Sequence, residues 1–175
     1  PHVVMNLDVE NRRAGNRQVW ESNSTAVQAW AERRAAEFGL PISNAVLHGG
    51  VGALLAEIWP GQPKVFLSIL PAAVQDVQRV IEELVYHSFL YTFSPEPPFR
   101  IMGVGDKALP LVTQPCRWGP HVAFPVSALL IDGPGSKEFW VLYGSGDSEA
   151  RRWVASWEDL QTFLPSSSVA AVSAL

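Results

Sequence analysis

The stretch that decides the fold is His121–Asp147, HVAFPVSALLIDGPGSKEFWVLYGSGD. Two apolar runs flank a Gly/Pro turn at 132–135, and a Gly-x-Gly-Asp loop closes the stretch at Asp147. This order predicts a β-hairpin. A shift of 75 positions lays Val51–Leu55 on Val126–Leu130, and it brings an earlier turn and an earlier apolar run close to their later counterparts. A repeat of this length with a strand–turn–strand core predicts blade-like units of a β-propeller.

The composition indicates one globular, β-rich domain. Hydrophobic residues make up 47% of the 175 residues and charged residues only 17%, which excludes a disordered chain. Seven Trp, eight Phe and fourteen Pro favour strands and turns over a helical bundle. The net charge of −4 supplies no basic surface, so we expect no nucleic-acid partner.

Several classes of site are excluded by what the sequence lacks. A single cysteine, Cys116, excludes an internal disulfide and a Cys-rich zinc site. The four His have no ligand spacing, so no metal site is predicted. Residues 49–52 are Gly-rich but lack the Lys-Ser/Thr of a phosphate loop, and we expect no cofactor. No apolar run approaches the roughly 20 residues of a membrane span.

Hydrophobic periodicity, helix caps and turn residues predict the order of elements along the chain. An amphipathic helix is expected at 24–38, and a short helix at 156–163 opens with a capping box. The segment 72–83 is expected to be a loop or a short helix, and 105–120 a connection. We expect one β-rich domain over 1–165 and a flexible tail over 166–175. Strands are expected near 2–9, 16–21, 50–58, 64–70, 84–93, 99–104, 121–131, 138–143 and 149–155.

The predicted fold class is mainly β with flanking helices, built from partial β-propeller-like antiparallel meanders. A propeller closes with roughly four to eight blades, and this chain supplies about half of a ring. The remainder of a larger chain, or further copies in a homo-oligomer, would then complete it. The alternative is an α+β fold with a single twisted antiparallel sheet, or a two-sheet sandwich, flanked by the helix.

Two segments carry a resemblance to a known family. Residues 92–101, TFSPEPPFRI, and Val122–Asp147 resemble the closing blades of five-bladed β-propeller carbohydrate-active proteins. These are glycosidase and glycoside-phosphorylase propellers, and propeller modules attached to glycosyltransferases. The shared motifs are the "PPF-R-I" strand end, the "FP" strand opening and the "YG-x-x-D" exit. The resemblance spans about 45–163 and implies glycan binding or processing, but the early blades that usually hold part of the carboxylate machinery are missing.

Asp147 is the candidate catalytic residue, because glycines at 144 and 146 let its carboxylate project from the exit loop. Asp147 is equally compatible with a plain turn residue. His48 and His121 precede the two inner strands and are candidate substrate contacts, as are Arg100 and Tyr143 of the family-like motifs. A structural role is the alternative for both histidines, and for Arg100 the alternative is a salt bridge to a neighbouring acid such as Glu96.

The sequence leaves two candidate functions. The first is a carbohydrate-active module of a larger secretory-pathway or cell-envelope enzyme, with a carbohydrate as its partner. Trp59, Trp118 and Trp140 could stack on sugar rings if they are exposed, and packing in the core or in turns is the alternative. Glycoside hydrolysis needs two carboxyl groups flanking the bond, and no second acid pairs with Asp147 in the sequence. The second function is a non-catalytic interaction module whose sheet and exposed Trp bind a protein partner.

Overall fold

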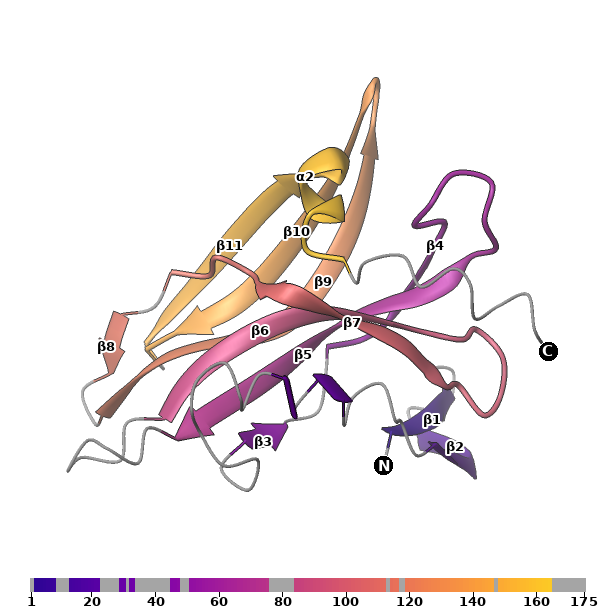
Figure 1. Ribbon diagram of the computed structural model, residues 1–175, viewed down its shortest axis with the longest axis horizontal. Helices are drawn as coiled ribbons and strands as arrows, with labels where there is room; N and C mark the ends of the chain where they lie inside the picture. Colours follow the sequence, from indigo (N-terminus) through magenta and orange to yellow (C-terminus); the bar gives the residue numbers. More distant parts are fainter. Residues whose placement is uncertain are drawn as a thin grey trace.

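The structure is a computed structural model that describes residues 2–8, 13–22, 29–30, 32–33, 45–47, 51–75, 84–112, 114–116, 119–146 and 148–164. Figure 1 shows two large sheets that meet at an angle and a separate small hairpin. The elements are β1 (His2–Asp8), β2 (Arg13–Ser22), β3 (Ala45–Leu47), β4 (Leu54–Ala56), β5 (Val65–Gln75), β6 (Leu84–Phe93), β7 (Ile101–Ala108), β8 (Gln114–Cys116), β9 (Gly119–Gly133), β10 (Ser136–Ser145), β11 (Glu149–Ser156) and α2 (Trp157–Gln161).

The first sheet is an antiparallel meander. Its order is β3-β5-β6-β7, with β4 also pairing with β5. Residues 94–100 make the tight connection from β6 to β7, in which the Phe99 N–H donates to the Glu96 carbonyl at 2.8 Å. The prolines of this segment end β6 as predicted, because each removes an amide donor. The predicted strand at 84–93 is confirmed, and the next strand begins at Ile101 and runs to Ala108 instead of ending at 104.

The prediction that the strand at 64–70 stops before Pro71 is wrong. β5 continues through Pro71 to Gln75, and only 76–83 of the expected loop lie outside the described residues. The Ser88 carbonyl accepts from the Leu109 N–H, so it points toward the β7 side and away from β5. Ser88 is the cross-strand partner of Pro71, so the missing proline N–H faces the opposite edge of β5. At that edge β3 and β4 leave a gap, and no ladder hydrogen bond is lost.

The second sheet is also a meander, with the order β8-β9-β10-β11. The stretch His121–Asp147 contains the β9–β10 hairpin, with Gly133 paired to Ser136 across its turn. The predicted connection at 105–120 is wrong in part, because it contains the end of β7, all of β8 and the start of β9. Ser156 caps α2 by accepting from the Asp159 N–H at 3.0 Å, as the sequence predicts.

The two hairpins related by 75 residues are not copies of one unit. β4 pairs with β5 as Leu54 opposite Leu67. The positions 75 residues later do not pair with each other, because Leu129 lies opposite Trp140 and not opposite Leu142. A strand–turn–strand hairpin forms in both places, but the register differs by two residues. The structure therefore does not confirm a repeated blade.

The main core lies between the two sheets. Alternate residues of β5 (Val65, Leu67 and Ile69) meet Phe139 and Val141 of β10 there. Leu160 of α2 and Leu164 join the same cluster, so α2 covers the inner face of the second sheet. This shared core makes one packed unit of the two sheets.

A second cluster covers the other face of the first sheet. The residues of β5 and β6 that point away from the main core gather around Trp30, which is 3% exposed. Trp30 packs edge-on against Phe89 at 4.9 Å between ring centroids, and its Nε1 donates to the Gly105 carbonyl at 3.2 Å. Residues 29, 30, 32 and 33 are helical, in agreement with the helix expected at 24–38, whose other residues lie outside the described part.

The mainly β class is confirmed. A single antiparallel sheet is not supported, because the described strands of the main body divide between two sheets that close into no barrel. The propeller arrangement is not confirmed and stays a prediction.

Candidate functional site

The predicted site residues are not brought together among the described residues. Asp147 and His48 lie outside them, and His121 is described only as a β9 strand position opposite Pro115. Arg100 immediately precedes β7 of the first sheet, and Tyr143 lies near the end of β10 in the second sheet. Their roles in substrate binding and catalysis therefore stay predictions.

Tyr143 is buried on the inner face of β10, with 4% of its surface exposed. Its hydroxyl accepts a hydrogen bond from the Val112 N–H at 3.3 Å, and the Ser145 hydroxyl donates to the Val112 carbonyl at 3.1 Å. The segment that holds Val112 also bonds the first sheet, through the Leu109 N–H and the Ser88 carbonyl at 2.7 Å. Tyr143 therefore helps to fix residues 109–112, a segment that joins the two sheets and that we call the strap.

Arg100 is exposed and makes no ion pair with another described residue, so the expected pair with Glu96 does not form. The Ser94 N–H donates to its backbone carbonyl at 2.9 Å, which fixes the main chain and leaves the guanidinium in solvent. An unpaired exposed cation is an ordinary surface feature, and alone it indicates no ligand.

The most unusual surface of the described chain is the outer face of the β9–β11 sheet. On β10 the residues 139, 141, 143 and 145 are buried, and the intervening residues point to the opposite side. We define the outer face by six apolar residues on that side, which are Val126, Leu129, Ile131, Trp140, Leu142 and Val154. Phe124, opposite Gly144, lies on the same side but packs edge-on against Tyr86 of the first sheet. Because α2 packs on the inner face, it leaves this side uncovered (Figure 1).

Cross-strand pairing makes the outer face continuous. Leu129, Trp140 and Val154 form one row across β9, β10 and β11. Leu129 is 40% exposed and Val154 is 39% exposed, and Ile131 extends the patch by one row with 36% exposed. The largest contiguous apolar patch on a soluble protein is often a functional surface, and large exposed patches mark interaction sites.

A β-bulge adds the most exposed member. Leu142 pairs with Ser127 but Tyr143 pairs with Pro125, which leaves Val126 as an extra residue in β9. Pro125 is buried, whereas Val126 is 64% exposed, so the bulge turns the valine side chain outward. Bulges re-aim side chains in this way.

Trp140 lies in the middle of the outer face and contacts one acidic and one basic side chain. Its Nε1 donates to Glu138 Oε2 at 2.8 Å, and the Arg152 guanidinium stacks over its ring at 4.3 Å from the centroid. The sequence makes Trp140 a candidate for sugar stacking. Arg152 occupies one face of the ring, so a sugar would have to use the other face or displace the arginine.

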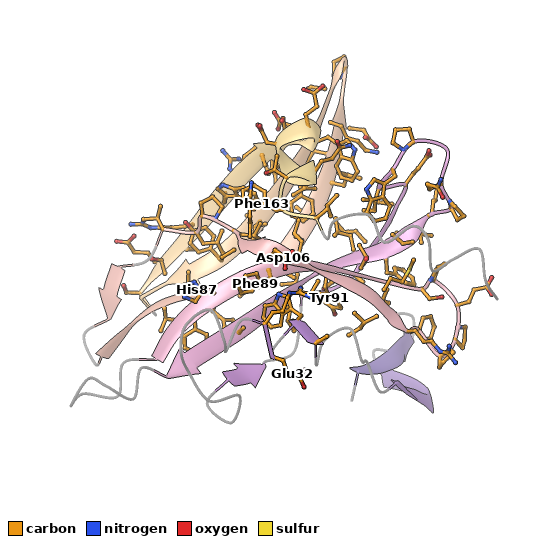
Figure 2. All side chains as sticks on the ribbon, in the orientation of Figure 1. Glu32, His87, Phe89, Tyr91, Asp106 and Phe163 are labelled. Carbon is orange, nitrogen blue, oxygen red and sulfur yellow. The ribbon has the colours of Figure 1, made fainter. Side chains whose placement is uncertain are left out.

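The titratable groups add little chemistry. Burial raises the pKa of Tyr91 above its ordinary value, and a hydrogen bond with Ser68 partly opposes the shift. The hydrogen bond to Glu149 raises the pKa of Arg151, which remains a cation in any case. Figure 2 places Tyr91, Phe89 and Asp106 on the first sheet. Within the described ranges no cluster of His, Cys, Asp or Glu is suited to hold a metal ion.

Comparisons with protein-family models, with curated proteins and with solved structures found no match to this chain. The resemblance to propeller carbohydrate-active proteins therefore stays a prediction. No helix in the described part of the chain combines the length and the apolar character needed to cross a membrane.

The outer face was not predicted, although the sequence carries a signal for it. Residues 139–143, FWVLY, and 128–131, ALLI, are continuous apolar runs. A strand with one wet face alternates apolar and polar residues, whereas a continuous run is typical of a strand covered on both faces.

Proposed function

We propose that this protein is a non-catalytic interaction module that binds a flat, apolar protein surface through the outer face of the β9–β11 sheet. The observation that carries the proposal is the continuous apolar row of Leu129, Trp140 and Val154, in which Leu129 and Val154 are exposed and Trp140 is half-buried. The sheet face presents an extended apolar surface to a partner of complementary shape, and burial of apolar area supplies the free energy of association.

The composition of the face also supports a protein partner. Aromatic residues and Arg are enriched in protein interfaces, and the face has Trp140 at its centre with Arg152 against it. The indole N–H of Trp140 already donates to Glu138, so this ring has no free donor with which to orient a small polar substrate.

Site-specific photo-crosslinking tests the proposal. A benzophenone amino acid replaces Val126 in one variant and Leu55 in a matched control, because Leu55 is an exposed apolar residue of β4, with 52% of its surface exposed. We expect irradiation of producing cells to give protein–protein adducts at position 126, mapped by peptide mass spectrometry, and few at position 55. The adducts should disappear when Leu129→Glu is added.

Two results would contradict the proposal. One is an adduct yield at position 126 that is no greater than at position 55. The other is saturable binding to a defined oligosaccharide on a glycan array that is lost in Asp147→Ala, because that would favour the carbohydrate function.

A further inference from the structure

The outer face has a charge arrangement that restricts its partner. It carries one acid and one base, Glu138 and Arg152, which lie on opposite sides of Trp140 along the strand direction. Glu138 belongs to the row of Ile131 and Ser156, whereas Arg152 belongs to the row of Leu142. The face is therefore neutral overall, with its acidic end one row before Trp140 and its basic end one row after.

We infer that the partner is a second copy of this chain, docked face to face through the outer face; this inference rests on the proposed function. A two-fold interface places the same patch against itself, so each contact occurs twice. A rotation axis that passes near Trp140 can set Glu138 of one copy against Arg152 of the other, and by symmetry it makes the reciprocal pair as well. The apolar row of Leu129, Trp140 and Val154 is then buried between two sheets, as in a β-sandwich.

The sheet edge argues against the other simple way to join two copies. β11 has a neighbouring strand on one side only among the described strands, so edge-to-edge pairing with a second β11 is geometrically open. That edge carries Glu149, Arg151 and Arg152 within four residues. Charged side chains on an edge strand oppose strand addition. Face-to-face docking therefore fits the sequence better than a continuous sheet.

Sedimentation velocity of the whole chain, over a dilution series from about 100 μM to about 1 μM, tests the inference at the concentrations where weak and moderate dimers dissociate. We expect a concentration-dependent dimer. Leu129→Glu should weaken it by about 30-fold or more, as do substitutions at central interface residues. Leu55→Glu is the matched control, because it adds the same charge at an exposed leucine outside the face and should leave the dimer unchanged.

A charge exchange makes the test specific to the proposed pairing. Glu138→Arg and Arg152→Glu should each weaken the dimer, because each sets like charges against each other. The double variant with both substitutions should recover most of the lost affinity. Circular dichroism and thermal unfolding of each variant confirm that the fold is retained, so that a loss of dimer is not a loss of structure.

The outcomes separate this inference from the proposed function. A chain that stays monomeric at about 100 μM, yet forms adducts with other proteins at position 126, overturns the second-copy inference and leaves the proposed function standing. A dimer that Leu129→Glu does not weaken uses another surface and also overturns the inference. A monomer without adducts at position 126 overturns both.

Discussion

Gly105 lies against the backbone of Phe163 with no room for a side chain, so its replacement is a sharp test of how the first sheet and the C-terminal segment pack. The residue lies in β7, and its carbonyl accepts from Trp30 on one face of the first sheet. A Cβ at this position would overlap the Phe163 carbonyl oxygen far inside the 3.0 Å that real Cβ atoms keep, and it would lie 3.3 Å from the Leu90 carbonyl oxygen. Both neighbours are backbone atoms, so neither can move aside by a rotamer change.

Gly105→Ala should therefore destabilise the protein. Overpacking of a close contact costs about 1–3 kcal/mol, and the upper end applies because Leu160 and Leu164 anchor the segment that carries Phe163. The alanine also restricts the unfolded chain, which offsets about 0.4–1 kcal/mol of this cost. We expect a net loss of about 2 kcal/mol and a melting temperature lower by about 4–8 °C.

Urea unfolding followed by tryptophan fluorescence measures this change. The expected result is a lower midpoint with an unchanged m value, which indicates a loss of stability without a change in the surface exposed on unfolding. Gly144→Ala is the matched control, because Gly144 is also a strand glycine and nothing lies within 4 Å of the position that an added Cβ would take. This variant should be as stable as the wild type or more stable by up to about 1 kcal/mol. Equal stability of Gly105→Ala and the wild type would refute the described packing of Phe163 on β7.

Three further predictions concern buried polar groups. Tyr143→Phe should lower the free energy of unfolding by about 1 kcal/mol in urea titrations, because the Val112 N–H loses its hydrogen-bond partner. An unchanged free energy of unfolding would contradict the hydrogen bond between Tyr143 and Val112. Ser88→Ala should leave stability unchanged or raise it by about 1 kcal/mol, because the Ser88 hydroxyl is buried without a partner among the described residues; a loss would show that the hydroxyl is bonded. Burial raises the pKa of Tyr91, so the folded chain keeps this proton at a pH where the unfolded chain has lost it. The resulting stabilisation is present below pH 10 and is lost as the pH rises above it, so unfolding midpoints should fall more steeply there for the wild type than for Tyr91→Phe.

Local patterns in the sequence predicted most of the strands. The aromatic run at 84–93 forms β6 with the predicted ends, and the Ser156 cap starts α2 as expected. The continuation of β5 through Pro71 could not be predicted, because β5 tolerates a proline there only owing to the gap between β3 and β4 along its neighbouring edge. The predicted repeat is not confirmed for a similar reason, since similar residue patterns do not fix the register of a hairpin.

The site was harder to predict than the fold. Tyr143 belongs to a family-like motif, but its hydroxyl contacts the Val112 backbone 31 residues earlier, a pairing that no local pattern reveals. Val126 is the most exposed apolar residue of the face because of a β-bulge that no pattern in the sequence predicts. Asp147 and His48 lie outside the described residues, so their predicted roles stay open to the Asp147→Ala experiment.

Hydroxyl-radical footprinting in producing cells tests the central claim, that a protein covers the outer face, most directly. In the isolated chain Val126 is 64% exposed, Leu129 40% and Leu55 52%, so free chains should be oxidised at all three positions. We predict that Val126 and Leu129 are protected in cells while Leu55 is not, and that Leu129→Glu restores the oxidation of Val126. Oxidation of Val126 and Leu129 in cells to the same extent as Leu55 would contradict the claim.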